Sequence, residues 1–535
     1  MSACHHALFL IEVQKQIFEE LLQLCGRATL AALARTCRAF NETAINVLWF
    51  KLDNIVPLVK CMPAVGEIRW RNLEFLSLNR ALSCVDWDVF FKYSGRVRIL
   101  AAESHNFQIV DSIFLSLCAP PERRALLPCL KSLHWRQDIA ESEISILLLH
   151  ALLTPVLTDM NLSFTRYSMP LENCLRIIAS TCPSLKSFHV AHSGSNFGDT
   201  TFPEHHVVRS SCHLESVTNK HTSQSVLRHL AHLPNLRSMN VGSLPANLSS
   251  EWMANVAHNN MSPFSCLHHL SFEKSRCAST VKFLVALRLN LQSFACTFRG
   301  PSDMKPICHA LVRVARSDML KSITLSCTRQ RQVLFASISP LYKFGNVTQF
   351  SMNLRNLDAT HISDNTLSLL AKSWPFLVRL YLNWGGWKGR SGITHEGLIE
   401  LLSRCSQMEE LIISVDFSWV DEDTVLGVMD SEIVGSKCMF AAFLRSGGMD
   451  PDPPFLISLL KALLPNLRGL IRPTPVLRQA FSPEAINRNW AHQEKIWSCK
   501  TLPAAIHGYE DGYSTTFSDS RLSECNSSVC KVLAC

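Results

Sequence analysis

A short apolar motif, leucine-x-x-leucine-x-leucine with other apolar residues allowed at each site, recurs along most of this 535-residue chain. Most copies start 22 to 33 residues apart. One copy arises easily by chance, but about a dozen at nearly constant spacing indicate a repeat array in which each unit stacks on the next. The copies start at Val97, Leu130, Leu157, Leu185, Leu214, Leu236, Leu267, Leu291, Leu320, Val347, Leu377, Met408 and Leu467.

The spacing of these motifs brackets the leucine-rich-repeat period of roughly 20–29 residues. Segments with helical spacing lie between them, and two of these, near Leu175 and Leu398, are followed by Cys182 and Cys405 before the next motif. We therefore predict an α/β fold in which a three-helix N-terminal module precedes a leucine-rich-repeat solenoid, a curved parallel sheet with outer helices. The motif residues should point inward, and the alternating strand residues should face outward.

The first 55 residues predict three short helices, from apolar residues spaced by three or four. Gly26 suits the end of the first helix. Thr29 is expected to cap the second helix and Asn41 the third. Three helices this short leave apolar surface that needs a partner.

The run from Ala7 to Leu52, "ALFLIEVQKQIFEELLQLCGRATLAALARTCRAFNETAINVLWFKL", resembles an F-box. The matching features are an apolar-E-x-x-x-x-I-F opening, the second helix "LAALARTCRAF" and the closing Leu48-Trp49. The resemblance is closest to F-box proteins with leucine-rich repeats, a group expanded in mushroom-forming fungi.

This resemblance implies docking on the Skp-type adaptor of a cullin–RING ubiquitin ligase. The family usually has Leu-Pro at the opening, whereas this chain has Leu10-Ile11, which removes the preorganisation that proline gives a helix start. The alternative is that the helices only cap the repeat array. By the resemblance, the adaptor face or its supporting core would comprise Leu10, Ile17, Phe18, Leu21, Leu30, Leu33, Cys37, Phe40 and Trp49.

Partner recognition is expected on the outward strand positions near the C-terminal repeats. Earlier outward positions are small and mostly uncharged, whereas the later ones include aromatic residues and arginine, which interface hot spots favour. The alternative is that some of the tryptophans pack between repeats. The predicted target-binding residues are Arg379, Tyr381, Asn383, Trp384, Trp387 and Glu410.

The patterns divide the chain into four parts. We expect an F-box-like module over residues 1–55, a helical linker over 56–95, the solenoid over 96–475 and an irregular tail over 476–535. The glycine-rich stretch 415–454 breaks the period and is expected to be an irregular insertion. The tail lacks sustained periodicity, which predicts flexibility.

Composition and motifs argue against several other classes of protein. The net charge of +8 comes from 52 basic and 44 acidic residues with no block of like charges, so we expect no nucleic-acid partner. No apolar stretch is long enough for a membrane span, and Met1 to His6 lacks a signal's basic region. We expect a cytoplasmic or nuclear protein whose 21 cysteines stay reduced.

No catalytic constellation is found, and we expect no enzyme activity, cofactor or metal. The glycine-rich run Gly385 to Gly392 lacks the spacing of a phosphate loop, and the histidines near Cys212 lack a paired C-x-x-C. The resemblance to an F-box, with repeats immediately after it, implies a non-catalytic substrate receptor of an SCF-type ubiquitin ligase. The alternative is a ligase-independent scaffold or inhibitor that uses the repeats alone.

Overall fold

The computed structural model describes most of the chain up to Leu470, in two compact units that divide between Val217 and Thr218. Each unit is described by itself. The described residues are 10–70, 73–102, 109–137, 144–164, 168–192, 204–245, 263–285, 287, 289–298, 304–327, 335–354, 362–382, 391–418, 420, 423, 437–438, 440–443, 459–464, 466 and 469–470.

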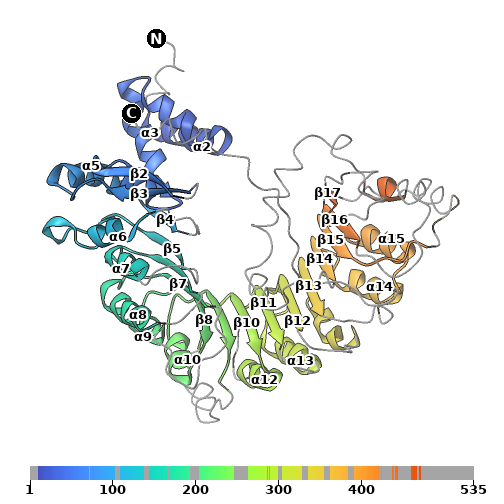
Figure 1. The fold of residues 1–535 in the computed structure, drawn as a ribbon. Helices are drawn as coiled ribbons and strands as arrows, with labels where there is room; N and C mark the ends of the chain where they lie inside the picture. Colours follow the sequence, from blue (N-terminus) through green and yellow to red (C-terminus); the bar gives the residue numbers. More distant parts are fainter. Residues whose placement is uncertain are drawn as a thin grey trace. The chain divides into compact units, whose positions relative to one another are not determined.

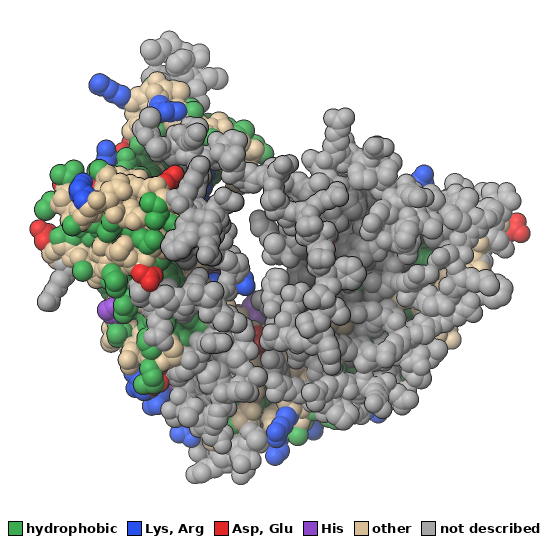
Figure 2. Space-filling model, in the orientation of Figure 1, with side chains coloured by type: hydrophobic (Ala, Val, Ile, Leu, Met, Phe, Trp, Pro, Cys, Tyr) green, Lys and Arg blue, Asp and Glu red, His purple; other side chains and the backbone are tan. Residues whose placement is uncertain are grey.

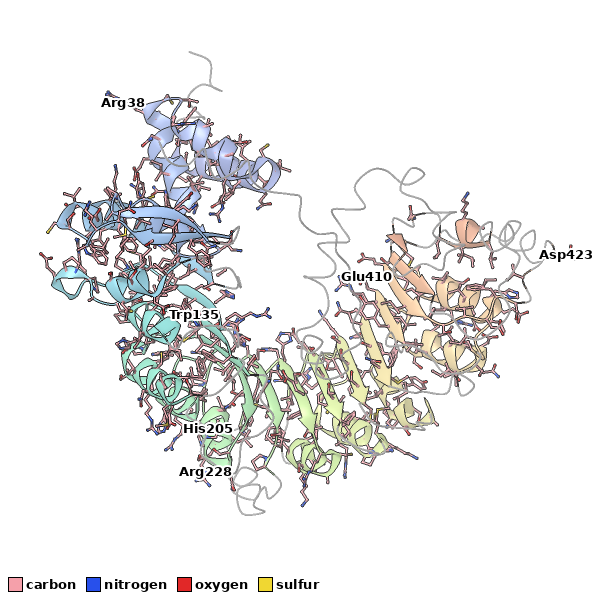
Figure 3. All side chains as sticks on the ribbon, viewed as in Figure 1. Arg38, Trp135, His205, Arg228, Glu410 and Asp423 are labelled. Carbon is pink, nitrogen blue, oxygen red and sulfur yellow. The ribbon has the colours of Figure 1, made fainter. Side chains whose placement is uncertain are left out.

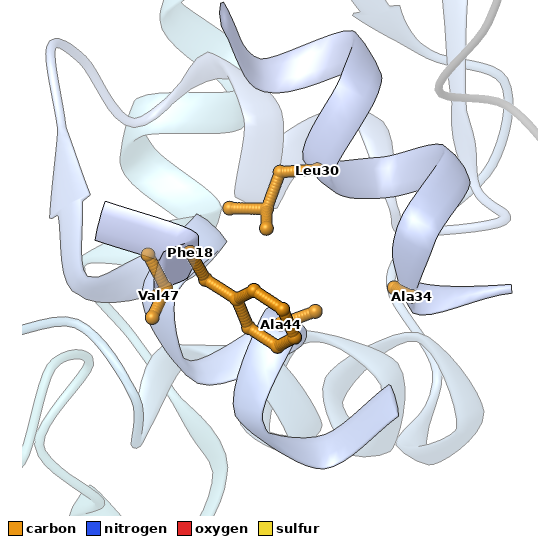
Figure 4. Packing of buried hydrophobic residues seen from close by; sticks show 5 residues of the cluster. All are labelled: Phe18, Leu30, Ala34, Ala44 and Val47. Atoms are coloured by element: carbon orange, nitrogen blue, oxygen red, sulfur yellow. The ribbon is translucent and has the colours of Figure 1, made fainter. Parts of the chain in front are cut away.

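The first unit begins with helices α2 (Ile11–Ala34) and α3 (Arg38–Phe50). Gly26 interrupts α2 with non-helical backbone angles, so three helical segments form as predicted. Their apolar faces meet in a small core (Figure 4). The core residues are Phe18, Leu30, Ala34, Ala44 and Val47.

The two predicted helix caps are wrong. Thr29 lies inside α2, and its hydroxyl donates to the Cys25 carbonyl at 3.2 Å. Helix α3 begins at Arg38, three residues before Asn41, and the Asn41 amide donates to the Ala34 carbonyl at 2.8 Å. Both side chains bond to the backbone of the preceding turn or helix, an alternative that short polar residues often take.

The segment predicted as a helical linker contains an antiparallel hairpin as well as helices. After β1 (Lys51–Leu52) come α4 (Val56–Lys60), the hairpin strands β2 (Val65–Trp70) and β3 (Leu73–Leu78), and α5 (Cys84–Ser94). Trp49 of α3 stacks on Tyr93 of α5 with ring centroids 4.8 Å apart, and Arg96 pairs with Glu42 at 2.6 Å. These contacts attach α3 to α5 and to the residues that follow α5 within the first unit.

Parallel strands follow in chain order, with helices on one face of the sheet (Figure 1). In the first unit β1 pairs with β4, β4 with β5, β5 with β6, and β6 with β7, all without slips in register. The strands are β4 (Ile99–Ala102), β5 (Ser132–Gln137), β6 (Asp159–Phe164) and β7 (Ser187–His192), with β8 (Ser216–His221) crossing the unit boundary. The helices are α6 (Asp111–Leu117), η1 (Pro121–Arg123), α7 (Ile144–Ala151), α8 (Met169–Thr181) and α9 (Glu204–Ser210).

The second unit repeats the same scheme. Its strands are β9 (Ser238–Ser243), β10 (His269–Ser275), β11 (Ser293–Phe298), β12 (Ser322–Cys327), β13 (Gln349–Leu354), β14 (Arg379–Leu382), β15 (Glu410–Ile413), β16 (Phe440–Phe443) and β17 (Gly469–Leu470). Its helices are α10 (Gln224–Ala231), α12 (Cys277–Val285), α13 (Lys305–Val314), η2 (Phe335–Lys343), α14 (Asp364–Ser373) and α15 (His395–Arg404).

One backbone arrangement recurs at the start of the strands and fixes their register. The amides of Lys131 and Ser132 both donate to the Arg98 carbonyl, at 2.8 and 3.0 Å, and later repeats reproduce this pair of bonds. The accepting carbonyls in such pairs are those of Arg98, Lys131, Thr158, Lys186, Arg237, His268, Gln292, Lys321, Thr348 and Val378. Wherever this pair of bonds is present, one repeat holds the next in the same position.

Burial alternates along the strands as predicted. In β12, Ile323 and Leu325 are buried while Ser322 and Thr324 remain partly accessible. The first residue of each motif from Val97 to Met408 is fully buried, and Leu467 lies outside the described residues. The long parallel sheet with flanking helices confirms the predicted α/β repeat architecture.

The stretch predicted as an irregular insertion contains a strand. Strand β16 pairs in parallel with β15, and Glu410 is in register with Phe440. The ladder thus continues through part of 415–454, although much of that stretch lies outside the described residues, as does the whole tail 476–535.

Candidate partner-binding surfaces

The structure separates the predicted adaptor residues into a face and a core. Leu10 and Ile17 are exposed by 55% and 38%, and Cys37 is also exposed. Phe18 and Leu30 are buried. They can support a docking face from behind but cannot contact a partner.

The remaining predicted adaptor residues also serve packing. Leu21, Leu33 and Phe40 lie partly buried against the helical core, and Phe40 meets Phe18 edge to face at 5.8 Å. Trp49 stacks on Tyr93 of α5, so this side chain packs α3 against α5 and does not form part of an open docking face.

An apolar stripe runs along α2, formed by Leu10, Ile17 and Leu24. Successive members are seven residues apart, so they drift by only about 20° per step around the helix. Leu24 is 80% exposed, the largest fraction among the three. Sequence reasoning missed Leu24 as a site residue, although its spacing from Ile17 was a usable signal.

The exposed side of α2 next to this stripe is polar. Lys15 and Glu19 form an exposed ion pair one turn apart at 3.8 Å, and Gln16 and Gln23 are exposed between and beyond them. The stripe of Leu10, Ile17 and Leu24 is therefore an unmatched apolar edge on an otherwise solvated surface. Exposed apolar rows of this kind mark interaction sites.

Outward strand positions form the second candidate surface. In the first unit, His134, Asn161 and His189 occupy equivalent positions on three neighbouring strands. His134 and His189 share hydrogen bonds with Ser132 and Ser187 at 3.2 and 2.8 Å. Burial lowers the pKa of His189, which favours the neutral form of that side chain in a polar row.

In the second unit, Arg379, Tyr381 and Glu410 come together as predicted. Arg379 and Tyr381 alternate with buried leucines on β14, and Glu410 lies beside Arg379 on β15. The Tyr381 hydroxyl donates to the Glu410 carboxylate, and the Arg379 Nε lies 3.3 Å from the same carboxylate. Glu410 projects on the strand side of the repeats, away from α14 and α15 (Figure 3).

The surroundings of Tyr381 in this trio keep its hydroxyl protonated. Burial, and then the Glu410 carboxylate, hold the pKa of Tyr381 well above its usual range. The hydroxyl therefore stays protonated and donates, while the half-exposed Arg379 guanidinium remains available to a partner's carboxylate or carbonyl oxygens. The other predicted members, Asn383, Trp384 and Trp387, lie outside the described residues.

The cysteines that end helices are packing residues. Cys182 and Cys405 terminate α8 and α15 and are buried. Burial raises the pKa of the Cys182 thiol to about 11 and that of Cys405 to about 12, so both thiols stay protonated and unreactive. The Cys405 thiol donates to the Trp374 carbonyl at 3.5 Å.

Comparison with known proteins adds little. No family model matches the sequence, and no curated protein matches it. These comparisons show no family.

One solved structure to which the chain is similar is that of the Toll–Spatzle complex, described as a molecular hub in Drosophila development and innate immunity. The identity is 10% and the TM-score 0.26, and the match covers 63% of this chain and 53% of that one. The chain thus spans about half the length of that neighbour. At this TM-score the likeness carries no argument, and the fold rests on the strand pairings above.

The described residues contain no group of three or more His, Cys, Asp or Glu side chains placed to hold a metal ion. Within the same residues, no helix is both long and apolar enough to cross a bilayer.

Proposed function

We propose that this protein is the substrate-recognition subunit of an SCF-type ubiquitin ligase. The N-terminal helices dock on a Skp-type adaptor, and the outward strand face of the repeats holds a target protein. The subunit itself makes and breaks no bonds. It raises the effective concentration of target lysines near the charged conjugating enzyme, and it acts in the cytoplasm or nucleus.

One observation carries the proposal: the exposed stripe of Leu10, Ile17 and Leu24, which lies beside polar exposed side chains of α2. Covering a Leu or Ile side chain contributes roughly 1.5–3 kcal/mol. Covering three such residues therefore supplies part of the binding energy of a helical module on an apolar groove of a partner.

The strand face supports the second half of the proposal. Its outward residues in the first repeats are small and polar, and the Arg379–Tyr381–Glu410 trio adds residue types that dominate binding energy at interfaces. Because Glu410 is held by two neighbours, Arg379 and Tyr381 are preorganised and lose little entropy when a target binds.

The docking half is tested with the full chain and purified Skp-type adaptor by calorimetry. The double variant Ile17→Glu/Leu24→Glu should weaken binding by about a hundredfold or more, since two apolar contacts are lost and two charges are desolvated. The control Gln16→Glu/Gln23→Glu adds the same charge at the exposed positions just before Ile17 and Leu24, about 100° around the helix from the stripe, and should bind within about twofold of wild type.

Failure of the wild-type chain to bind adaptor at micromolar concentration would remove the ligase role. Equal weakening by both double variants would show that charge, rather than the apolar stripe, controls binding. Matching thermal unfolding midpoints would establish that both variants are folded.

The second candidate is a ligase-independent scaffold or inhibitor. It is favoured by Leu10-Ile11, where the resembling family has Leu-Pro. The same variants separate the two functions in cells, because a scaffold carrying Ile17→Glu/Leu24→Glu would leave the abundance of its bound target unchanged. A ligase receptor carrying that change would let the target accumulate.

A further inference from the structure

The positive charge of this protein is concentrated in one part of the chain. Residues 218–348 contain 15 Lys and Arg against 4 Asp and Glu, a net charge of +11. The remaining residues together carry a net charge of −3. No run of like charges marks this region, because the basic residues are spread over successive repeats.

The described basic residues of this region are mostly exposed. The exposed Lys and Arg side chains are Arg228, Arg237, Arg276, Lys282, Lys305, Arg313, Arg316, Lys321 and Lys343. Two acidic residues are described there. Asp318 pairs with Arg316 at 2.8 Å, and Glu273 accepts a hydrogen bond from Asn240 at 2.9 Å.

Helix α13 shows the bias most clearly. Lys305, His309 and Arg313 lie four residues apart along its exposed face, and the helix contains no acidic residue. Arg313 has no acidic residue three or four positions away, whereas the pairs Glu172–Arg176 on α8 and Glu400–Arg404 on α15 occupy such positions. Lys305 and Arg313 thus place two positive charges on the exposed face of α13, and the helix itself contains no acidic side chain.

Neighbouring elements extend this face. Helix α13 packs beside α12 on one side and η2 on the other, and these bring Lys282 and Lys343 to the same layer. Figure 2 shows blue side chains along the lower part of the view, where Figure 1 places α10, α12 and α13. We call the set Lys282, Lys305, Arg313 and Lys343 the basic helical face.

We propose that the basic helical face binds an acidic polypeptide segment. Single-stranded nucleic acids are held by basic residues interleaved with aromatic ones, whereas no described Phe, Tyr or Trp between residues 224 and 343 is exposed. Readers of duplex grooves insert a helix or ribbon, but α12 and α13 lie packed side by side.

An apolar point on the same face also favours a polypeptide. Val285 is 50% exposed on α12, three residues beyond Lys282. A peptide side chain can cover it, while a phosphate backbone gains nothing from it. This surface lies on the helices rather than on the strand face, and the inference does not rest on adaptor docking.

The test uses the full chain and a labelled polyglutamate peptide, followed by fluorescence anisotropy at increasing salt. Wild type should bind at low ionic strength and release the peptide as salt shortens the screening length. The variant Lys282→Glu/Arg313→Glu should bind about tenfold more weakly, because two attractions become repulsions.

The matched control is Arg38→Glu/Lys131→Glu, which changes two exposed basic residues outside this region by the same charge. It should stay within about twofold of wild type. The proposal is overturned if wild type does not bind polyglutamate, if both variants weaken binding equally, or if duplex DNA of equal charge binds more tightly than the peptide. Thermal unfolding of each variant checks that it is folded, and Lys282→Gln/Arg313→Gln replaces the reversal if it is not.

Discussion

Gly26 breaks helix α2 with a backbone φ of 81°, a conformation that side-chain-bearing residues adopt at a cost. A methyl group at this position would meet no neighbouring atom within 4 Å. Any penalty for replacing Gly26 therefore comes from the backbone alone.

Gly26→Ala should lower the free energy of unfolding of the first unit by about 1–3 kcal/mol. The control is Gly95→Ala, also in open space but with a φ of −65° that alanine adopts freely. Urea unfolding should show Gly95→Ala unchanged or more stable by less than about 1 kcal/mol. Equal effects at the two glycines would show that the kink at Gly26 does not exist in solution.

Asp86 is a fully buried carboxylate with an unusually complete set of donors. Arg80 donates to it at 2.6 and 3.0 Å, the Ser83 amide at 2.7 Å and the Ala64 amide at 2.9 Å. The hydrogen bonds from Arg80, and then those from Ser83 and Ala64, hold its pKa well below the ordinary 3.8.

A lowered pKa fixes the direction of the pH effect. The stabilisation from Asp86 is fully present above about pH 4 and is lost as the pH falls through its folded-state pKa. Asp86→Asn should cost roughly 1–3 kcal/mol at neutral pH and should flatten the loss of stability on acidification. Urea unfolding at pH 7 and below pH 4 measures both, and an unchanged slope with pH would contradict this role.

Individual polar residues were the hardest to assign from sequence. Thr29 and Asn41 are typical capping residues, yet each bonds to the backbone of a preceding turn or helix because the helices begin elsewhere. One capping pair that does form, Ser83 with Asp86, also involves Arg80 and Ala64, which donate to the Asp86 carboxylate. Local propensity cannot anticipate such contacts.

At the scale of elements, the strands of the repeats bury alternate side chains. Ile323 is fully buried within β12, while its neighbour Thr324 lies on the partly accessible face. The register partners of Ile323 on the two neighbouring strands are Phe294 and Phe350, which are buried as well. Ile323 therefore lies in the core between two phenylalanine-bearing strands.

Ile323→Ala should therefore lower the free energy of unfolding by about 2–5 kcal/mol, through lost apolar burial and the cavity left behind. Thr324→Ala, one position along the same strand, should change it by less than about 0.5 kcal/mol. Chemical unfolding of the two variants compares them directly. Similar losses would mean that the strand register is wrong.

The elements themselves were largely predictable because their signal repeats. Each motif from Val97 to Met408 marks a buried position at the start of a parallel strand, and independent copies reinforce one another. The hairpin β2–β3 and strand β16 were missed because neither repeats the leucine pattern. Strand β16 reads Phe-Ala-Ala-Phe, and only its pairing with β15 identifies it.

At the scale of the whole molecule, the candidate surfaces differ in how much of them could be predicted. The apolar N-terminal residues were found through their resemblance to an F-box, but burial was needed to separate Ile17 from Phe18. The basic helical face was missed because its residues are far apart in sequence. A charge count along the chain shows an excess of basic residues but does not show which of them share a surface. Only the packing of α12, α13 and η2 places Lys282 and Lys343 in the same layer.

The proposed division of labour places docking at one end of the chain and target recognition along the repeats. It predicts that the adaptor protects the helical module and leaves the strands unaffected. Since amide exchange reports local opening, a partner that covers one element slows exchange there in particular.

Hydrogen–deuterium exchange of the full chain, with and without Skp-type adaptor, is the most direct measurement of this claim. Adaptor should slow exchange in residues 10–50, and Ile17→Glu/Leu24→Glu should abolish that protection while exchange in β5 to β15 stays the same. Unchanged exchange in residues 10–50, or protection confined to the strands, would contradict the account.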